Sequence, residues 1–345
     1  MIANHMKFAW RHLVKDRQFS LLNLLGLSTG LAAAILIYLW INDEIHVDRH
    51  FHNNGQLYQV MGNINTSGHV STSDAHSVIL GETLEKNIPE IIHSATTTPA
   101  AWFNHFSVSH GDVTVKASGT FASKDYFTVF PHKLLQGNRS MVLQDKNAIV
   151  VSSRLAKKLF STTDVVGKVL QWKWYNFSVQ TIVTGVFEEA PVNATHQFDL
   201  LLSLESWSSD IIRTNGIPDI SGGPFNTYVV VKEGADINRL NAVIAPLITK
   251  QFPDANISLF LRPYSSQHLY GNYVNGKQDG GRIAYVRLFS LIGIFILVIA
   301  CVNFMNLSTA RASMLESVDK VVALLSPCWN SLPTKKHSAW VNPVR

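Results

Sequence analysis

Two long apolar segments interrupt an otherwise mixed pattern of hydrophobic and polar positions. The first runs from Leu21 to Ile41 and the second from Leu288 to Ala310, and neither contains a charged residue. At a rise of about 1.5 Å per residue, a helix of either length spans the roughly 30 Å hydrocarbon core of a bilayer. The pattern therefore predicts two transmembrane helices, with residues 42–287 as a large body between them.

Within this body, short apolar runs typical of strands alternate with amphipathic segments typical of helices. Strands are expected at Val113–Ala117, Ala148–Val151, Phe177–Val183 and Thr227–Val231, several of them ending in glycine or Asp/Asn turns. The interleaved order predicts an α+β domain of two subdomains, which a body of this length accommodates.

Two amphipathic helices are predicted with their start signals. Apolar residues of 153–160 fall on one face, and Ser152 or Ser153 is placed to cap the helix N-terminus. A longer helix is expected after Asp236, and Pro246 should kink or shorten it, because proline removes a backbone donor and clashes with the preceding turn.

The positive charge lies outside the two apolar segments. Residues 1–20 carry four basic and one acidic side chain, residues 311–345 carry five and two, and the body carries 20 and 21. This asymmetry predicts that both termini are cytoplasmic and that the body faces the opposite side of the membrane. It also argues against a nucleic-acid partner, since the net charge of +5 is not concentrated on the body.

The first 20 residues predict a leader that lies on the lipid surface. Basic residues at Lys7, Arg11 and Lys15 form a stripe beside the apolar positions Met6 and Trp10, a pattern suited to the headgroup layer. The apolar segment that follows is too long for a signal peptide and has no small-residue cleavage site, which favours an uncleaved anchor.

The cysteines exclude a disulfide framework for the body. The chain has two cysteines, Cys301 in the second apolar segment and Cys328 in the tail. An extracytoplasmic body without cysteine must fold on its hydrophobic core, which its size permits.

One stretch matches most of a phosphate-binding P-loop. Gly271 to Lys277 (GNYVNGK) has the first seven positions, but Gln278 replaces the Ser/Thr that would bind Mg²⁺. No buried strand is expected before the stretch and no helix directly after it. We therefore interpret it as a flexible juxtamembrane linker and expect no nucleotide cofactor.

Three histidines crowd together after the first apolar segment. His46 and His50 have the i, i+4 spacing that can share a metal ion, with His52 and Asp48 nearby. No second group of ligands is evident, so structural or incidental roles are favoured over a metal site. Neither a nucleophile elbow nor an H-E-x-x-H helix is recognisable, and we expect no catalytic, cofactor-binding or metal-binding residues.

Several runs along the chain resemble one family. In the body they are GTFASKDYFTVF (Gly119 to Phe130), LLQG (from Leu134), IVVSSRLAKKLF (from Ile149), VVGK (from Val165) and VTGVFEEAP (from Val183). At the membrane boundaries they are WRHLVKDRQFSLLNLLGL (from Trp10), DEIHVDRHFH (from Asp43) and IACVNFMNLSTAR (from Ile299). In this order they resemble the MacB/FtsX-type ABC-transporter permeases, over residues 1 to about 312.

The resemblance implies a bacterial inner-membrane permease subunit with a MacB-like periplasmic core domain, composed of a porter-like α/β subdomain and a β-rich subdomain. Its partners would be an ABC-type ATPase, a second permease chain as homodimer or heterodimer, and the lipid bilayer. Relatives use ATP-driven motion of their helices to move the periplasmic domain and to export or release a substrate. The permease itself performs no chemistry, so no catalytic residue is carried over.

The C-terminal segment departs from the family pattern. From Ala312 onward the chain lacks the basic, Gly-containing cytoplasmic segment and the further membrane helices expected of a relative. We therefore expect an N-terminal portion of a permease, with a cytoplasmic tail at residues 311–345.

Two other functions remain open at this point. A two-span receptor with an extracytoplasmic ligand-sensing domain has the same topology, although its tail would be short for a signalling output. A membrane-anchored hydrolase is the third possibility, but it lacks a recognisable site.

Overall fold

The computed structural model describes residues 17–103, 105–207 and 219–330. Its contacts divide the chain into two compact units. One is the continuous segment Asn42–Val286, and the other contains the described residues on either side of that segment. The predicted leader up to residue 16 and the tail after Asn330 lie outside the described residues.

The flanking unit contains most of helices α2 (Arg17–Ile45) and α9 (Ile283–Asn330). The last turn of α2 and the first turn of α9 belong to the segment Asn42–Val286. Among the described residues, the helices long and apolar enough to cross a membrane are these two, at Leu24–Ile45 and Ile283–Asn306. Only 6% of the first window and 11% of the second is buried, whereas the core helix of a soluble domain would be mostly buried. Helix α9 continues past Ala310, where the apolar pattern ends, to Asn330.

Small residues let these two helices pack closely against each other. A Cβ added to Gly30 would lie 2.8 Å from the Cβ of Ala300, and one added to Gly293 would lie 3.2 Å from Ile37. Trp40 packs edge to face against Phe289 with ring centroids 5.0 Å apart. Close contact at small residues is the usual way in which helices associate within lipid.

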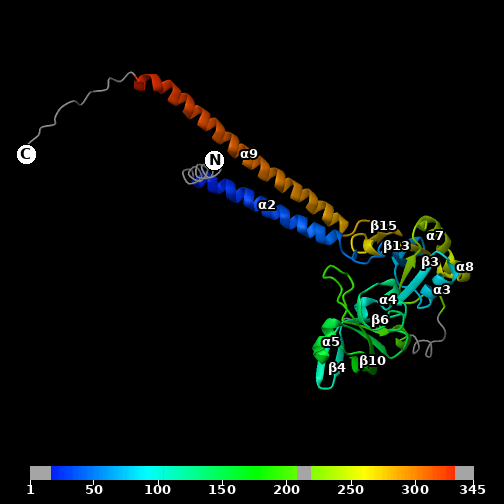
Figure 1. The fold of residues 1–345 in the computed structure, drawn as a ribbon. Coiled ribbons are helices and arrows are strands. Elements are labelled where there is room, and N and C mark those ends of the chain that lie inside the picture. Colours follow the sequence, from blue (N-terminus) through cyan, green and yellow to red (C-terminus); the bar gives the residue numbers. More distant parts are fainter. Residues whose placement is uncertain (1–16, 104, 208–218, 331–345) are drawn as a thin grey trace, which may run out of the picture. The chain divides into compact units, whose positions relative to one another are not determined.

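The segment Asn42–Val286 is built on a mixed sheet, which is 13-stranded in the described part of the chain. Its path runs β13-β1-β12-β3-β6-β11-β8-β10-β9-β4-β5, with β2 beside β1 and β7 beside β10. Figure 1 labels β13 and β3 in one half of this segment and β6, β10 and β4 in the other. The strands are β1 (Leu57–Thr66), β2 (His69–Ser73), β3 (Ile91–Thr97), β4 (Phe106–His110), β5 (Val113–Ala117), β6 (Gly119–Ala122), β7 (Leu134–Gln136), β8 (Ala148–Ser152), β9 (Val169–Trp174), β10 (Phe177–Phe187), β11 (Leu200–Ser203), β12 (Asn226–Val231) and β13 (Ile257–Pro263).

The helices of this segment are short. Those whose bounds lie within the described residues are α3 (Leu80–Asn87), α4 (Tyr126–Val129), α5 (Ser153–Phe160), α7 (Ile237–Ile244) and α8 (Leu247–Gln251), with 3₁₀ turns η1 (Ala100–Phe103), η2 (Pro253–Ala255) and η3 (Tyr264–Ser266). A separate hairpin joins β14 (Tyr273–Val274) to β15 (Lys277–Gln278).

One half of the sheet has the order of a split βαβ fold. Strands β13, β1, β12 and β3 are neighbours in that order and pair antiparallel. Helix α3 lies between β1 and β3 in the chain, and α7 and α8 lie between β12 and β13. Two such βαβ units, interleaved in one antiparallel sheet, form the ferredoxin-like arrangement. The second half, β4 to β11, is inserted between β3 and β12. The mixed α and β architecture with two flanking apolar helices is thus confirmed.

Three hydrophobic clusters form the core in the described part of the chain. The α/β half contains one, which includes Val60, Leu84, Val229, Leu240 and Leu261. The β-rich half contains another, which includes Phe106, Phe121, Val151, Leu155 and Trp172. The third, with Phe51, Phe130, Val150, Leu201 and Tyr264, draws residues from both halves and so joins them through buried apolar contact.

The predicted local signals act as expected. The backbone N–H of Leu155 donates to Oγ of Ser152 at 3.1 Å, which caps α5. The side chain of Asp236 caps α7, and Pro246 falls at the break between α7 and α8. Strands cover each of the four runs predicted, although β10 extends beyond Val183 to Phe187.

Candidate functional site

A buried carboxylate ties together the points at which the chain enters and leaves the segment Asn42–Val286. Oε1 of Glu44, near the end of α2, accepts hydrogen bonds from Nε2 of His268 and Nη1 of Arg282, each at 2.8 Å. Glu44 is 8% exposed, and Arg282 directly precedes α9. A charge-assisted hydrogen bond to such a buried group is stronger than a neutral one. We call these three residues the Glu44 clasp.

A second buried carboxylate, that of Asp48, lies shortly after the end of α2. Asp48 is fully buried and adopts a positive φ of 60°, a left-handed conformation that Asp tolerates better than most residues. Its carboxylate accepts hydrogen bonds from the backbone N–H of Thr195 at 2.8 Å and from the Thr195 hydroxyl at 2.6 Å. The N–H of Asp48 in turn donates to the carbonyl of Asn193 at 3.3 Å. Asp48 therefore fixes the middle of the segment 189–199.

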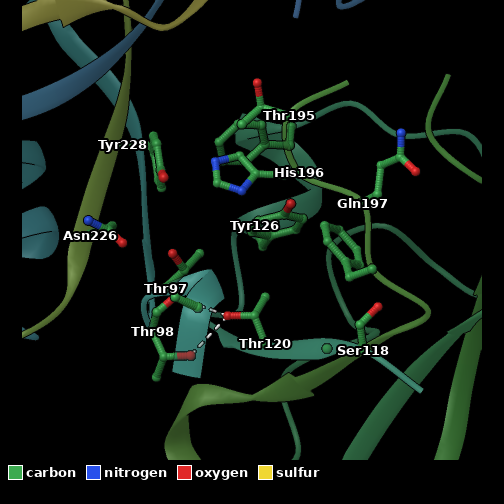
Figure 2. A pocket seen from close by; sticks show the side chains of 14 residues that line it. Thr97, Thr98, Ser118, Thr120, Tyr126, Thr195, His196, Gln197, Asn226 and Tyr228 are labelled. Carbon is green, nitrogen blue, oxygen red and sulfur yellow. Dashed lines mark hydrogen bonds between the residues drawn. The ribbon is translucent and has the colours of Figure 1, made fainter. Parts of the chain in front are cut away.

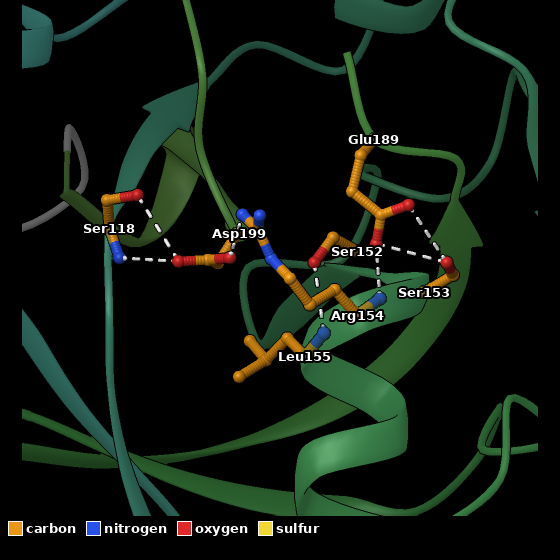
Figure 3. Close-up of polar contacts among 7 residues, drawn as sticks. All are labelled: Ser118, Ser152, Ser153, Arg154, Leu155, Glu189 and Asp199. Atoms are coloured by element: carbon orange, nitrogen blue, oxygen red, sulfur yellow. Dashed lines mark hydrogen bonds and ion pairs between the residues drawn. The ribbon is translucent and has the colours of Figure 1, made fainter. Parts of the chain in front are cut away.

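The ends of the segment 189–199 are fixed by two further carboxylates (Figure 3). Glu189 accepts hydrogen bonds at the start of α5 from the hydroxyl of Ser153, at 3.0 Å, and from the backbone N–H of Arg154. Asp199 accepts from Nη2 of Arg154 at 2.8 Å and from the N–H of Ser118 at 3.2 Å. The loop is thus held at three points along its length.

Hydrogen bonds at the start of α5 lower the pKa of the Glu189 carboxyl. Burial alone would raise the pKa of its carboxyl, but hydrogen bonds from the backbone N–H groups of Glu189 and Arg154 and from the Ser153 hydroxyl outweigh burial and lower the pKa. The carboxylate therefore stays ionised at a helix N-terminus, where negative charge is stabilised.

Histidine and aromatic rings fill the interior beside this loop. His132 is 7% exposed and packs against Phe51 and Phe198, with ring centroids 5.0 and 5.7 Å away. Burial, reinforced by the nearby His50, Arg139 and His196, lowers the pKa of His132 to about 3. Burial also lowers the pKa of His50 and of His196. The rings are therefore neutral at physiological pH.

The structure does not bring the histidines after α2 into one metal site. Nδ1 of His46 lies 2.6 Å from the carbonyl oxygen of Asn42, while the carboxylate of Asp48 is occupied by Thr195. The ring of His50 packs on Phe51, with centroids 4.0 Å apart. Across residues 17–103, 105–207 and 219–330, no group of three or more His, Cys, Asp or Glu side chains is arranged to hold a metal ion.

The P-loop-like stretch forms a hairpin, so its interpretation as a flexible linker is wrong. Val274 of β14 pairs with Lys277 of β15. Asn275 and Gly276 between them have φ of 50° and 77°, the pattern of a type I′ turn, which Asn-Gly favours. The carbonyl of Gly276 also accepts a hydrogen bond from Nδ2 of Asn63 at 3.1 Å, which fastens the hairpin to β1.

Sequence reasoning missed the Glu44 clasp and the Asp48 contacts. Glu44 and Arg282 are 238 residues apart in the chain, and Asp48 and Thr195 are 147 apart. In the sequence, Glu44 and Asp48 follow the apolar segment closely, but nothing there distinguishes them from the solvent-exposed carboxylates that are common on protein surfaces.

Comparisons with known proteins agree with this architecture. The family model of the MacB-like periplasmic core domain matches residues 20–247. A solved domain of a permease protein from Porphyromonas gingivalis is similar in fold, with a TM-score of 0.51 and 21% identity over 62% of this chain and 93% of that one. A search of curated proteins found no match.

Two further solved structures are similar at lower scores. The periplasmic region of MacB from Actinobacillus actinomycetemcomitans has a TM-score of 0.41 and 15% identity over 60% of this chain and 89% of that one. The extracellular domain of the ABC-type transporter YknZ from Gram-positive bacteria has a TM-score of 0.42 and 13% identity over 60% and 99%.

Proposed function

The chain belongs to the family of the MacB-like periplasmic core domain, and we propose that it is a permease subunit that couples ATP hydrolysis by a partner ATPase to movement of this domain. The chain contains a MacB-like periplasmic domain of an ABC-transporter-type permease, flanked by two candidate membrane helices. In this proposal, movement of the domain exports or releases a substrate.

The Glu44 clasp is the observation that carries this proposal. Glu44 belongs to α2, and Arg282 immediately precedes α9, so one carboxylate joins the segments that follow and precede the two apolar helices. The Arg282 side chain is exposed, but the carboxylate is buried and also bound to His268. A displacement of either helix end therefore acts on the same point of the domain.

The chain itself performs no chemistry in this proposal. ATP is bound and hydrolysed by the partner, at the cytoplasmic side. The hairpin at Gly271 to Lys277 supports this division, since a P-loop requires a strand, a phosphate-binding loop and a helix in succession.

The orientation and the partners follow from the charge distribution and the family. The basic excess in residues 1–20 and 311–345 supports cytoplasmic termini in the bacterial inner membrane, with the domain in the periplasm. The partners are an ABC-type ATPase, a second permease chain as homodimer or heterodimer, and the surrounding lipid.

Purification of the full chain from its native membrane tests the proposed coupling. An ATPase subunit should co-purify in fixed ratio, and its ATP hydrolysis in proteoliposomes should depend on the chain. Glu44→Ala should reduce this dependence, while Arg239→Gln, a change of an exposed arginine on α7, should leave it intact. Isolation without any ATPase, or hydrolysis that is indifferent to the chain, would contradict the proposal.

A further inference from the structure

A cavity of about 320 Å³ opens where the two halves of the sheet meet. Pairing between β3 and β6 is limited to one position, Thr97 with Ala122. Beside this junction the cavity is lined from β3, β6, β12 and α4, and from residues 195–198 of the loop described above (Figure 2). Its volume falls at the lower end of the range for small-molecule pockets.

The walls of the cavity are rich in neutral hydrogen-bonding groups. Hydroxyl and amide side chains come from several elements, namely Thr98, Ser118, Thr120, Thr195, Gln197 and Asn226. Hydroxyl groups both donate and accept, and amides offer both functions at fixed positions. The hydroxyls of Thr98 and Thr120 already pair with each other at 2.9 Å, so part of this polar wall is preorganised.

One ring nitrogen at the cavity lacks a partner within the described part of the protein. Nε2 of His196 is buried and makes no hydrogen bond there. The ring lies near Tyr228 and Tyr264, with centroids 6.4 and 6.1 Å away. Burial removes this nitrogen from water without compensation, and a ligand that pairs with it would recover part of the lost interaction.

The cavity has no group that would compensate an ion. None of its described lining residues is Asp, Glu, Lys or Arg, and burial lowers the pKa of His196, which keeps that ring neutral. Moving an ion into such a site without a partner charge is strongly unfavourable. The lining therefore selects against charged molecules.

From these features we infer that the cavity binds an uncharged, hydroxyl-bearing small molecule of about the size of a monosaccharide. The hydroxyl and amide groups match a ligand with several donors and acceptors. The rings of Tyr126, Phe198 and Tyr228 on the walls provide apolar faces for its carbon skeleton. This inference goes beyond the proposed coupling to an ATPase and does not depend on it.

The position of the cavity wall is set by contacts already described. Thr195, held by the buried carboxylate of Asp48, and Ser118, held by Asp199, both line the cavity. Fixing the wall before binding lowers the ordering cost that a ligand has to overcome. Asp48 acts here as a positioning residue, since it does not line the cavity itself.

Calorimetric titration of the full chain in lipid nanodiscs tests the inference. N-acetylglucosamine serves as the neutral probe, with glucosamine as the cationic and glucuronate as the anionic counterpart of similar ring size. Saturable binding of N-acetylglucosamine, about tenfold or more tighter than that of either charged sugar, is expected. Absence of saturable binding, or equal binding of the charged sugars, would overturn the inference.

Two variants locate the binding at the cavity. His196→Phe keeps a ring but removes the unpaired nitrogen, so it should weaken binding about tenfold, as a lost hydrogen bond does, without lowering the unfolding midpoint. Thr120→Val, a near-isosteric change on another wall, should weaken binding severalfold and serves if His196→Phe misfolds. His69→Phe, at an exposed position on β2, is the matched control. Unchanged binding in both cavity variants would refute the location.

Discussion

Protonation of His132 should make the stability of the MacB-like domain depend on pH. Its pKa is lowered from 6.5 to about 3, first by burial and then by the nearby His50, Arg139 and His196. The unfolded chain therefore binds a proton below pH 6.5 that the folded chain does not bind. As a result, the contribution of His132 to the free energy of unfolding is most favourable above pH 6.5 and is lost as the pH falls towards 3. At about 1.4 kcal/mol per pH unit, the loss from pH 6.5 to roughly pH 5 is about 2 kcal/mol.

His132→Phe removes this proton-binding difference while keeping an aromatic ring among Phe51, Tyr126 and Phe198. Urea unfolding of the full chain in detergent, followed by tryptophan fluorescence at about pH 7 and about pH 5, measures the effect. The free energy of unfolding should fall about 2 kcal/mol less between these pH values in the variant than in the wild-type protein. His50 and His196 remain in both proteins, so among these rings only His132 and its interactions with the other two differ between them.

His69→Phe provides the matched control, because His69 is exposed. It should show the full pH dependence of the wild-type protein. If the wild-type protein and His132→Phe lose the same free energy over this pH interval, the assignment of a buried neutral imidazole at His132 is wrong.

Three further outcomes are expected. Glu44→Ala should lower the free energy of unfolding by about 1–3 kcal/mol and Glu44→Gln by less, with Arg239→Gln near zero, as urea titration would measure; equal values for all three would exclude the clasp. The purified chain should neither bind nor hydrolyse ATP, and hydrolysis abolished by Lys277→Ala would restore an enzymatic role. The segment 42–286, expressed alone, should melt in one cooperative calorimetric transition because its core is self-contained; a broad, non-cooperative transition would contradict this.

Local signals in the sequence predicted local structure well. Ser152 caps α5 and Pro246 ends α7 because the physics of a cap or of a missing N–H involves only neighbouring residues. The Asn275-Gly276 pair is typical of a hairpin turn, but the same stretch, Gly271 to Lys277, also matches most of a P-loop pattern. The hairpin holds this stretch in an extended pair of strands rather than around a phosphate.

Contacts between distant segments could not be predicted in the same way. The pairing of Asp48 with Thr195 and the cavity at the junction of β3 and β6 depend on how the insertion between β3 and β12 folds back onto the sheet. Hydrophobic periodicity identifies which face of a strand is buried, but it does not determine which strand becomes its neighbour. The order of the sheet therefore had to come from the structure.

Cysteine labelling with a membrane-impermeant reagent in intact bacterial cells is the most direct test of the topology. It asks whether the domain, flanked by two membrane helices, lies outside the cytoplasm. In a background with Cys301→Ala and Cys328→Ser, single cysteines replace Asn138 in the domain and Lys336 in the tail. A membrane-impermeant maleimide, given access to the periplasm, should label Asn138→Cys in intact cells and Lys336→Cys only after lysis. Labelling of Asn138→Cys only after lysis would contradict the account.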